Sequence, residues 1–455
     1  MHKQQRLVLI ISILASFVAF LDGSVVNVAL PAIVRNLGGG LVVQQWVVDA
    51  YMITLGSLML IAGSLSDLFG RKKVLGMGLA AFGITSVLCA MAPSAGFLIG
   101  SRALQGIAGA LLVPSSLALI ISAFSGRAQG KAIGTWTAWT GIAFIMGPLL
   151  GGFLIDLSSW RLIFAINVLP IAVTLWLLLH LEQPEVIREH TKIDWLGTIL
   201  CVVGLGGPVY ALIEQAHYGW GSVVIYVPLV CGLAAFAYFI KHEGTTKHPM
   251  LPLSLFTVRN FSIGNIATMA IYAGLAISGF LITVFVQQVG HYSAIQAGLA
   301  MLPVTAIMLL LSSRFGALSG KYGPRLFMAV GPLLSSVGFL LLLRVDRSVS
   351  YWTQIFPGVL MFGLGLAATV APLTSAVLGS IDSRQAGIAS AINNAVSRVS
   401  GLIAIAALSL LTGTALDVAG FHRGVVAMAG LLIIGGVVSG FGIQNPKSST
   451  VDKTV

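Results

Sequence analysis

Three charged side chains lie inside long apolar stretches of the sequence, where charge is normally excluded. Asp22, Arg102 and Arg398 each have apolar residues on both sides. A charged side chain at the centre of a membrane helix costs roughly 2.5–3.5 kcal/mol even on a lenient insertion scale, so such residues are functional by default. A buried carboxyl group can take up and release a proton, and this predicts proton binding at Asp22.

The other ionisable residues are weaker candidates. All eight histidines fall at the ends of apolar stretches or between them, so we do not expect a histidine relay. Asp49 and Glu214 lie near predicted helix ends, where we expect solvated caps rather than coupling sites. Asp22 could also serve only in a helix-packing hydrogen bond. For Arg398, lining a cavity, binding an anionic group and pairing with a distant acid all stay open.

The composition describes the elements that must position these residues. The chain has 455 residues, of which 57% are hydrophobic and only 9% charged. A soluble domain carries about 25% charged residues. The composition therefore excludes a cytosolic globular enzyme, a disordered chain and a nucleic-acid binder. The three cysteines have no metal-binding spacing, and no metal site is expected.

Apolar windows predict fourteen membrane helices between residues 7 and 443, each long enough to cross a bilayer. With a cytoplasmic N-terminus, 18 of the 25 Lys and Arg residues fall on the cytoplasmic side and 5 outside. Because positive residues favour the cytoplasmic side, we expect both termini to be cytoplasmic.

An internal repeat organises the chain. The stretch GSLSDLFGRKK (63–73) recurs at an offset of 253 as GALSGKYGPR (316–325), so that Gly70 corresponds to Gly323. This predicts a 6 + 2 + 6 plan, a repeat arrangement used by secondary transporters. The expected units are a six-helix bundle (1–181), two inserted helices with linkers (182–260), a second six-helix bundle (261–445) and a cytoplasmic tail (446–455).

Four motifs resemble those of one transporter family. They are LDGSVVNVALPAI (21–33), GSLSDLFGRKK (63–73), RALQGIAGALLVPSS (102–116) and TGIAFIMGPLLGG (140–152). On these motifs, the chain resembles the major facilitator superfamily over essentially residues 1–445, specifically its fourteen-helix drug:proton antiporter branch. It departs from the family pattern at Ser24, Leu68, Ala108 and Ala143. The resemblance implies an all-α polytopic membrane protein with the fold of that superfamily.

The resemblance also implies roles for individual residues. Asp22 would carry the proton, with Arg102 influencing it. The cytoplasmic gating motif would comprise Gly63, Asp67, Gly70, Arg71 and Lys72. We expect Asp67 to meet a helix start near Gln385. The antiporter hinge motif would comprise Gly147, Pro148, Gly151 and Gly152. Candidate cavity residues are Asn27, Gln105, Trp136, Trp139 and Arg398.

The expected function is a proton-coupled multidrug efflux antiporter that exports lipophilic, neutral or monocationic compounds by alternating access. It would be a multi-pass, monomeric protein of the inner (plasma) membrane that uses the proton gradient and no cofactor. Its partners would be protons, lipophilic small molecules and the bilayer, with no nucleic acid. The alternatives are an exporter of a native metabolite, lipid or peptide and, far behind, a membrane-embedded enzyme or a channel.

Overall fold

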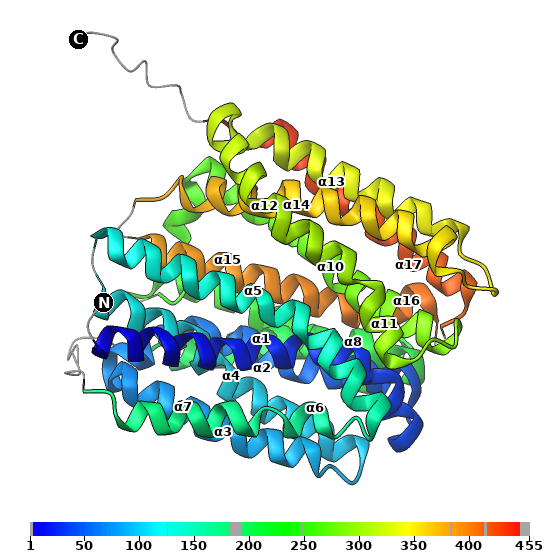
Figure 1. Ribbon diagram of the computed structural model, residues 1–455, viewed down its shortest axis with the longest axis horizontal. Helices are drawn as coiled ribbons and strands as arrows, with labels where there is room; N and C mark the ends of the chain where they lie inside the picture. The colour runs from blue at the N-terminus through cyan, green and yellow to red at the C-terminus, as the bar shows by residue number, and fades with distance from the viewer. Residues whose placement is uncertain are drawn as a thin grey trace.

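The computed structural model describes residues 3–124, 126–182, 193–247, 249–382, 385–413 and 416–445, and within these ranges every regular element is a helix. The helices run roughly side by side along the long axis of the molecule (Figure 1). The predicted all-α fold is confirmed. The predicted tail at 446–455 lies outside the described residues.

The N-terminal half (residues 3–181) contains seven helical segments that form six candidate spans. They are α1 (Lys3–Leu37), α2 (Gly40–Phe69), α3 (Arg71–Ala90), α4 (Ala95–Ala123), α5 (Gly126–Leu157), α6 (Leu162–Ala165) and α7 (Val168–Leu179). The last two segments form one span, interrupted around Asn167, where Pro170 follows within the first turn of α7.

Two inserted helices follow, and then the C-terminal half (residues 259–442). The inserted helices are α8 (Trp195–Tyr218) and α9 (Val223–Thr245), followed by the short η1 (Leu253–Thr257). The C-terminal half comprises α10 (Arg259–Gln288), α11 (Ala294–Ala300), α12 (Leu302–Tyr322), α13 (Pro324–Leu341), η2 (Leu342–Arg344), η3 (Tyr351–Ile355), α14 (Phe356–Leu378), α15 (Ala386–Ala406), α16 (Leu408–Thr412) and α17 (Val418–Gly442).

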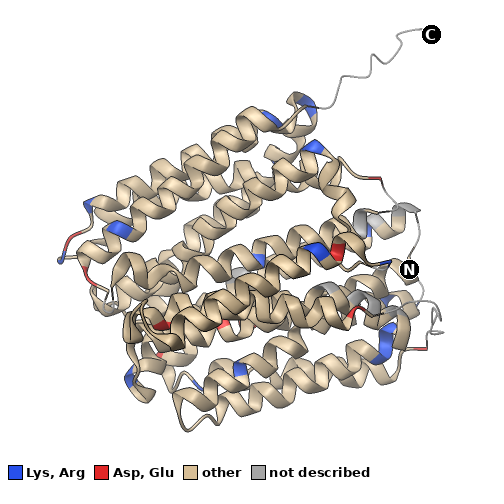
Figure 2. Ribbon diagram, turned by 180° about the vertical axis from the view of Figure 1, so that it is seen from behind, with Lys and Arg blue, Asp and Glu red and all other residues tan. Residues whose placement is uncertain are grey.

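Fourteen of these helical stretches are long and apolar enough to cross a membrane, as the sequence predicts. Charged residues gather mainly near the helix ends, and the middle of the bundle is almost free of them (Figure 2). A backbone surrounded by lipid must satisfy its own hydrogen bonds, which is why these apolar stretches are helical.

The two copies of the repeat turn have the same backbone. Gly70 between α2 and α3 has φ 92°, and Gly323 between α12 and α13 has φ 85°. Both values lie in a region that side chains with a Cβ atom rarely adopt. The sequence offset therefore corresponds to a structural repeat at these turns. The division at residues 181 and 260 and the cytoplasmic termini remain predictions.

The inserted helices pack on α2 and α15, one helix from each half. An apolar cluster joins Ile53 of α2, Leu205 and Val209 of α8, and Leu402 and Ala406 of α15. By contrast, α9 is mostly exposed along its apolar window, as expected for a lipid-facing helix. The helix α8 thus covers one side of the contact between the two halves.

Candidate proton-coupling site

Asp22 and Arg102 form an ion pair in the interior of the N-terminal half. The Nη1 of Arg102 lies 2.6 Å from Oδ2 of Asp22 and donates a second hydrogen bond of 2.7 Å to Oε1 of Gln105. The Nε2 of Gln105 donates in turn to Oδ1 of Asp22 at 3.1 Å. Asp22 is 0% exposed and Arg102 1% exposed, so both charges are fully desolvated and compensate each other. The residues that the sequence predicts for proton coupling are therefore neighbours in space.

Two further side chains complete this group, which we call the Asp22 cluster (Asp22, Ser86, Arg102, Gln105 and Asn167). The Nδ2 of Asn167 donates to Oδ1 of Asp22 at 2.9 Å, and the Nε2 of Gln105 donates to Oγ of Ser86 at 2.8 Å. The sequence analysis did not identify Ser86 or Asn167. A polar residue inside an apolar span, followed three positions later by a proline, was the signal available for Asn167.

Local helix geometry explains how the cluster assembles. Arg102 and Gln105 are three residues apart on α4, so their side chains lie on the same face. Asp22 lies in the middle of α1, and Asn167 lies at the interruption between α6 and α7. An interrupted helix can bring a polar side chain into a protein interior because the freed backbone is itself buried in protein.

Arg102 is held from other directions as well. Its Nε donates to the Val47 carbonyl at 3.1 Å, and its guanidinium carbon lies 4.2 Å from the ring centroid of Tyr51. The Arg102 side chain is enclosed by protein and does not extend toward the membrane interface. An aromatic face adds a favourable cation–π contact to the charge-assisted hydrogen bonds.

The hinge motif lies where α5 meets α1 and α11. A Cβ atom at Gly147 or Gly151 would collide with Ser24 or Val25 of α1. A Cβ atom at Gly152 would lie 2.5 Å from the Cα of Ile295, which belongs to α11 in the C-terminal half. Small residues of this kind allow close helix approach in membranes. The motif therefore joins α5 to its own half and to the other half.

The same end of α5 carries a polar contact between the halves. The two carboxylate oxygens of Asp156 accept the backbone N–H groups of Ala294 and Ile295 at 3.1 and 3.0 Å. These contacts lie at the end of the bundle opposite the N-terminus (Figure 1). At that end, Nε2 of Gln45 also donates to the Ile405 carbonyl at 2.6 Å, joining α2 to α15.

The gating motif is only partly described. The side chain of Asp67 and the surroundings of Gly63 lie outside the described residues, so the predicted contact of Asp67 near Gln385 stays a prediction. Arg71 donates to the Ala118 carbonyl at 3.0 Å, and Lys72 donates to the Leu181 carbonyl at 2.8 Å. Both side chains thus hold neighbouring helix ends of the N-terminal half.

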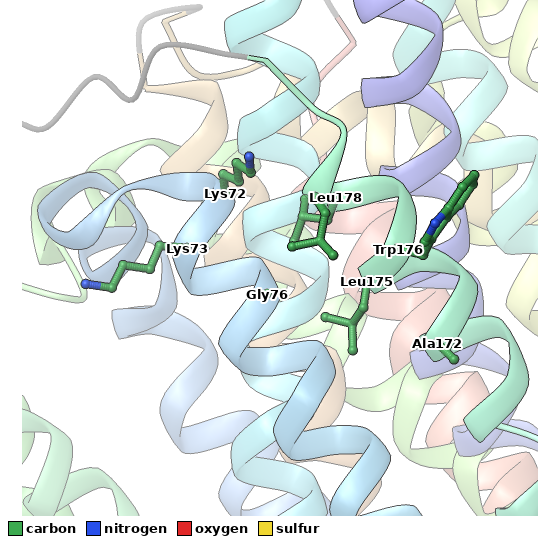
Figure 3. A pocket seen from close by; sticks show the side chains of 8 residues that line it. Lys72, Lys73, Gly76, Ala172, Leu175, Trp176 and Leu178 are labelled. Atoms are coloured by element: carbon green, nitrogen blue, oxygen red, sulfur yellow. The ribbon is translucent and has the colours of Figure 1, made fainter.

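A groove beside this motif has a volume of about 730 Å³. Its lining includes Lys72 and Lys73 of α3 and Leu175, Trp176 and Leu178 of α7, and Figure 3 shows Lys72 beside Leu178. It lies between α3 and α7, and none of its lining residues belongs to the Asp22 cluster. We therefore do not assign substrate transport to this groove.

The candidate cavity residues have different surroundings in the structure. Gln105 is fully buried in the Asp22 cluster, and its role in a substrate cavity stays a prediction. Trp136 donates to Oγ of Ser16 at 3.0 Å and packs on the core of the N-terminal half. Asn27 lies near Gly279 of α10 in the other half, and Trp139 is 49% exposed.

Two predicted helix caps have other surroundings. Asp49 is 0% exposed, and neither carboxyl oxygen has a hydrogen-bond partner among the residues that the structure describes. The expectation of a solvated cap is wrong there, because α2 begins at Gly40 and is covered by α4, α8 and α15. Glu214 is half-buried and accepts a 2.7 Å hydrogen bond from Nε1 of Trp46, which joins α8 to α2.

Comparisons with known proteins agree with this architecture. The Major Facilitator Superfamily profile matches residues 12–405. The chain is 33% identical over 405 residues to the methylenomycin A resistance protein of Bacillus subtilis, covering 88% of this chain and 86% of that protein. It is also 33% identical over 411 residues to the multidrug resistance protein Stp of Mycobacterium tuberculosis, covering 90% and 76%.

Solved transporters share the fold at low sequence identity. A peptide transporter superposes with a TM-score of 0.71 at 14% identity, covering 96% of this chain and 93% of that chain. A bacterial homologue of the lysosomal transporter Spinster, in an inward-facing conformation, gives 0.70 at 14% identity, covering 97% of each chain. With a family match over most of its length and fourteen spans, the chain is a multi-pass membrane transporter and not an enzyme, and it belongs to the major facilitator superfamily, fitting its fourteen-helix drug:proton antiporter branch.

Proposed function

We propose that the protein exports lipophilic small molecules across the plasma membrane in exchange for protons, by alternating access. The observation that carries the proposal is the Asp22 cluster: a fully buried carboxylate held by Arg102, Gln105 and Asn167 inside a membrane span. The drug-resistance relatives support the direction of transport. We further propose that the protein acts as a monomer, without a cofactor.

Protonation of Asp22 would act on the ion pair. In the charged state, Asp22 accepts hydrogen bonds from three donors that come from α4 and from the interruption between α6 and α7. A protonated carboxyl group has no charge to compensate Arg102, so the contact between α1 and α4 weakens. Arg102 would then depend on the Val47 carbonyl and Gln105.

A continuous set of contacts leads from Asp22 to the other half. Ser24 and Val25, one turn along α1, pack against Gly147 and Gly151 of α5. The next glycine, Gly152, packs against Ile295 of α11. A small shift of α1 would therefore be transmitted through α5 to the contact that closes this end of the bundle. Rigid helices with close-packed faces can carry such coupling.

The energy of one proton is sufficient for export. About one pH unit and about 100 mV together supply roughly 1.4 + 2.3 kcal/mol. If one proton is exchanged for a neutral molecule, this sustains a gradient of roughly 500-fold. Exchange for a monovalent cation cancels the movement of charge and leaves about tenfold.

Export of a native metabolite is the second candidate. One relative, 29% identical over 395 residues, is a tetracenomycin C resistance and export protein of Streptomyces glaucescens. That name describes the export of a compound as well as resistance to it. The two functions share the mechanism above and differ only in the source of the substrate.

The test uses proteoliposomes with an imposed pH gradient and a panel of fluorescent dyes. The wild type should transport at least one dye only while the gradient is present, and Asp22→Asn should not. Asp346→Asn is the matched control, because Asp346 is an exposed loop residue that contacts Ser348. Gradient-driven transport by Asp22→Asn at the wild-type rate would refute the assignment.

A further inference from the structure

Arg398 lies in the middle of α15, at the contact between the two halves. A Cβ atom at Gly56 of α2 would lie 3.9 Å from the Cβ of Arg398. The guanidinium carbon is 5.6 Å from the ring centroid of Phe20 on α1, and Tyr51 and Tyr272 lie within electrostatic range of it. These neighbours come from α1 and α2 of one half and from α10 of the other.

Within the part of the chain that the structure describes, the guanidinium of Arg398 contacts the ring of Phe20 but has no hydrogen-bond acceptor and no acidic partner. Across the described ranges, no hydrogen bond or ion pair involves its side chain. The other arginine inside a span, Arg102, has a carboxylate, an amide and a carbonyl as acceptors. A guanidinium presents five N–H donors, so Arg398 has donors available for a ligand. Arg398 is half-buried, so its side chain is not sealed inside the helix packing.

The nearby acids cannot supply the missing charge. Asp22 is already bound by three donors and is fully buried. Asp49 of α2 is fully buried, and no ion pair joins it to Arg398 among the described residues. The Asp22–Arg102 pair is neutral overall, so the charge left facing the other helices at this level is positive.

We propose that Arg398 binds the ionised acid group of the substrate, so that this transporter exports lipophilic acids in preference to lipophilic cations. The inference rests on the proposed function and narrows its substrate class. The planar guanidinium of an arginine can donate two parallel hydrogen bonds to the oxygens of a carboxylate or sulfonate. It also stacks on aromatic faces. The monocationic substrates favoured from the sequence would meet like charge at Arg398.

The experiment compares two dyes that share a xanthene ring system but differ in net charge. Sulforhodamine B is anionic and rhodamine 6G is cationic, and both are measured in proteoliposomes with an imposed pH gradient. The wild type should transport sulforhodamine B at least tenfold faster than rhodamine 6G. Arg398→Gln should lower sulforhodamine B transport at least tenfold and leave rhodamine 6G transport no slower.

Two further variants separate recognition from folding. Arg398→Lys keeps the charge without the planar fork, and it should retain more sulforhodamine B transport than Arg398→Gln. Arg347→Gln removes an exposed loop arginine and should behave as wild type. The dissociation constant of sulforhodamine B, measured by fluorescence anisotropy on purified protein, should rise at least tenfold in Arg398→Gln. A melting curve of each variant reports folding independently of transport.

The outcomes distinguish the two proposals. Faster transport of rhodamine 6G than of sulforhodamine B by the wild type would overturn the assignment of Arg398 and leave proton-driven export standing. Unchanged sulforhodamine B binding in a folded Arg398→Gln would do the same. A wild type that moves neither dye under the gradient would overturn the proposed function itself.

Discussion

Removing the charge of Asp22 should destabilise the protein and uncouple it, and a second substitution should separate the two effects. In Asp22→Asn, the side-chain amide offers one acceptor oxygen in place of two, and its NH₂ group would face donors. The Nη1 of Arg102, now 2.6 Å from the carboxylate, would be left as an unpaired buried charge. Breaking a buried ion pair on one side costs about 3–5 kcal/mol.

Arg102→Gln should cost a similar amount, because it leaves the Asp22 carboxylate unpaired. The double variant Asp22→Asn/Arg102→Gln removes both charges together. Its amides can bond to each other, to Gln105 and to Asn167. We therefore expect the double variant to be more stable than either single variant, with a coupling energy of about 3 kcal/mol in the double-mutant cycle.

The assay is unfolding by titration with sodium dodecyl sulfate, followed by tryptophan fluorescence, beside gradient-driven dye transport for the same four proteins. The double variant should recover stability but not transport, because neither side chain can then carry or respond to a proton. Additive losses of stability would refute the ion-pair reasoning. Recovery of gradient-driven transport in the double variant would refute the role of Asp22 as the proton carrier.

Three other predictions follow from contacts at the helix ends. Gly152→Ala should push α5 away from α11, because the new Cβ atom would lie 2.5 Å from the Cα of Ile295. Spin-label distances between α5 and α11 should therefore lengthen, and unchanged distances would contradict this. Asp156→Asn removes one of two acceptor oxygens, so the same distance distribution should broaden, whereas Asp346→Asn should not alter it. Gly70→Ala places a Cβ at φ 92° and should cost about 1–3 kcal/mol in the detergent titration; wild-type stability would show that the turn can relax.

The sequence predicts the fourteen spans well, because membrane helices depend on local composition and length. Each apolar stretch must satisfy its backbone within itself, so its conformation does not depend on its neighbours. The repeat turn could also be predicted from local sequence. Gly70 and Gly323 mark positions where the backbone needs a positive φ. The interruption at Asn167 was missed because hydropathy averaged over a span does not reveal a break in it.

The candidate site could be predicted only in part. Asp22 and Arg102 stand out because a charged side chain in a membrane span is energetically costly and therefore indicates a function. Nothing in their separation of 80 residues shows that they are paired. The sequence predicts a solvated helix end at Asp49, which is fully buried, because polarity alone does not show which neighbours cover a side chain.

By itself, the sequence determined the class of protein, the number of spans and the identity of the unusual charges, since these follow from composition along the chain. Only the tertiary structure decided which charges are compensated. Helix packing places Asp22 against Arg102 inside one half and leaves Arg398, at the contact between the halves, without an acidic partner among the described residues. The physical reason is that the energy of a buried charge depends on the donors and acceptors within a few ångströms, and those come from distant parts of the chain.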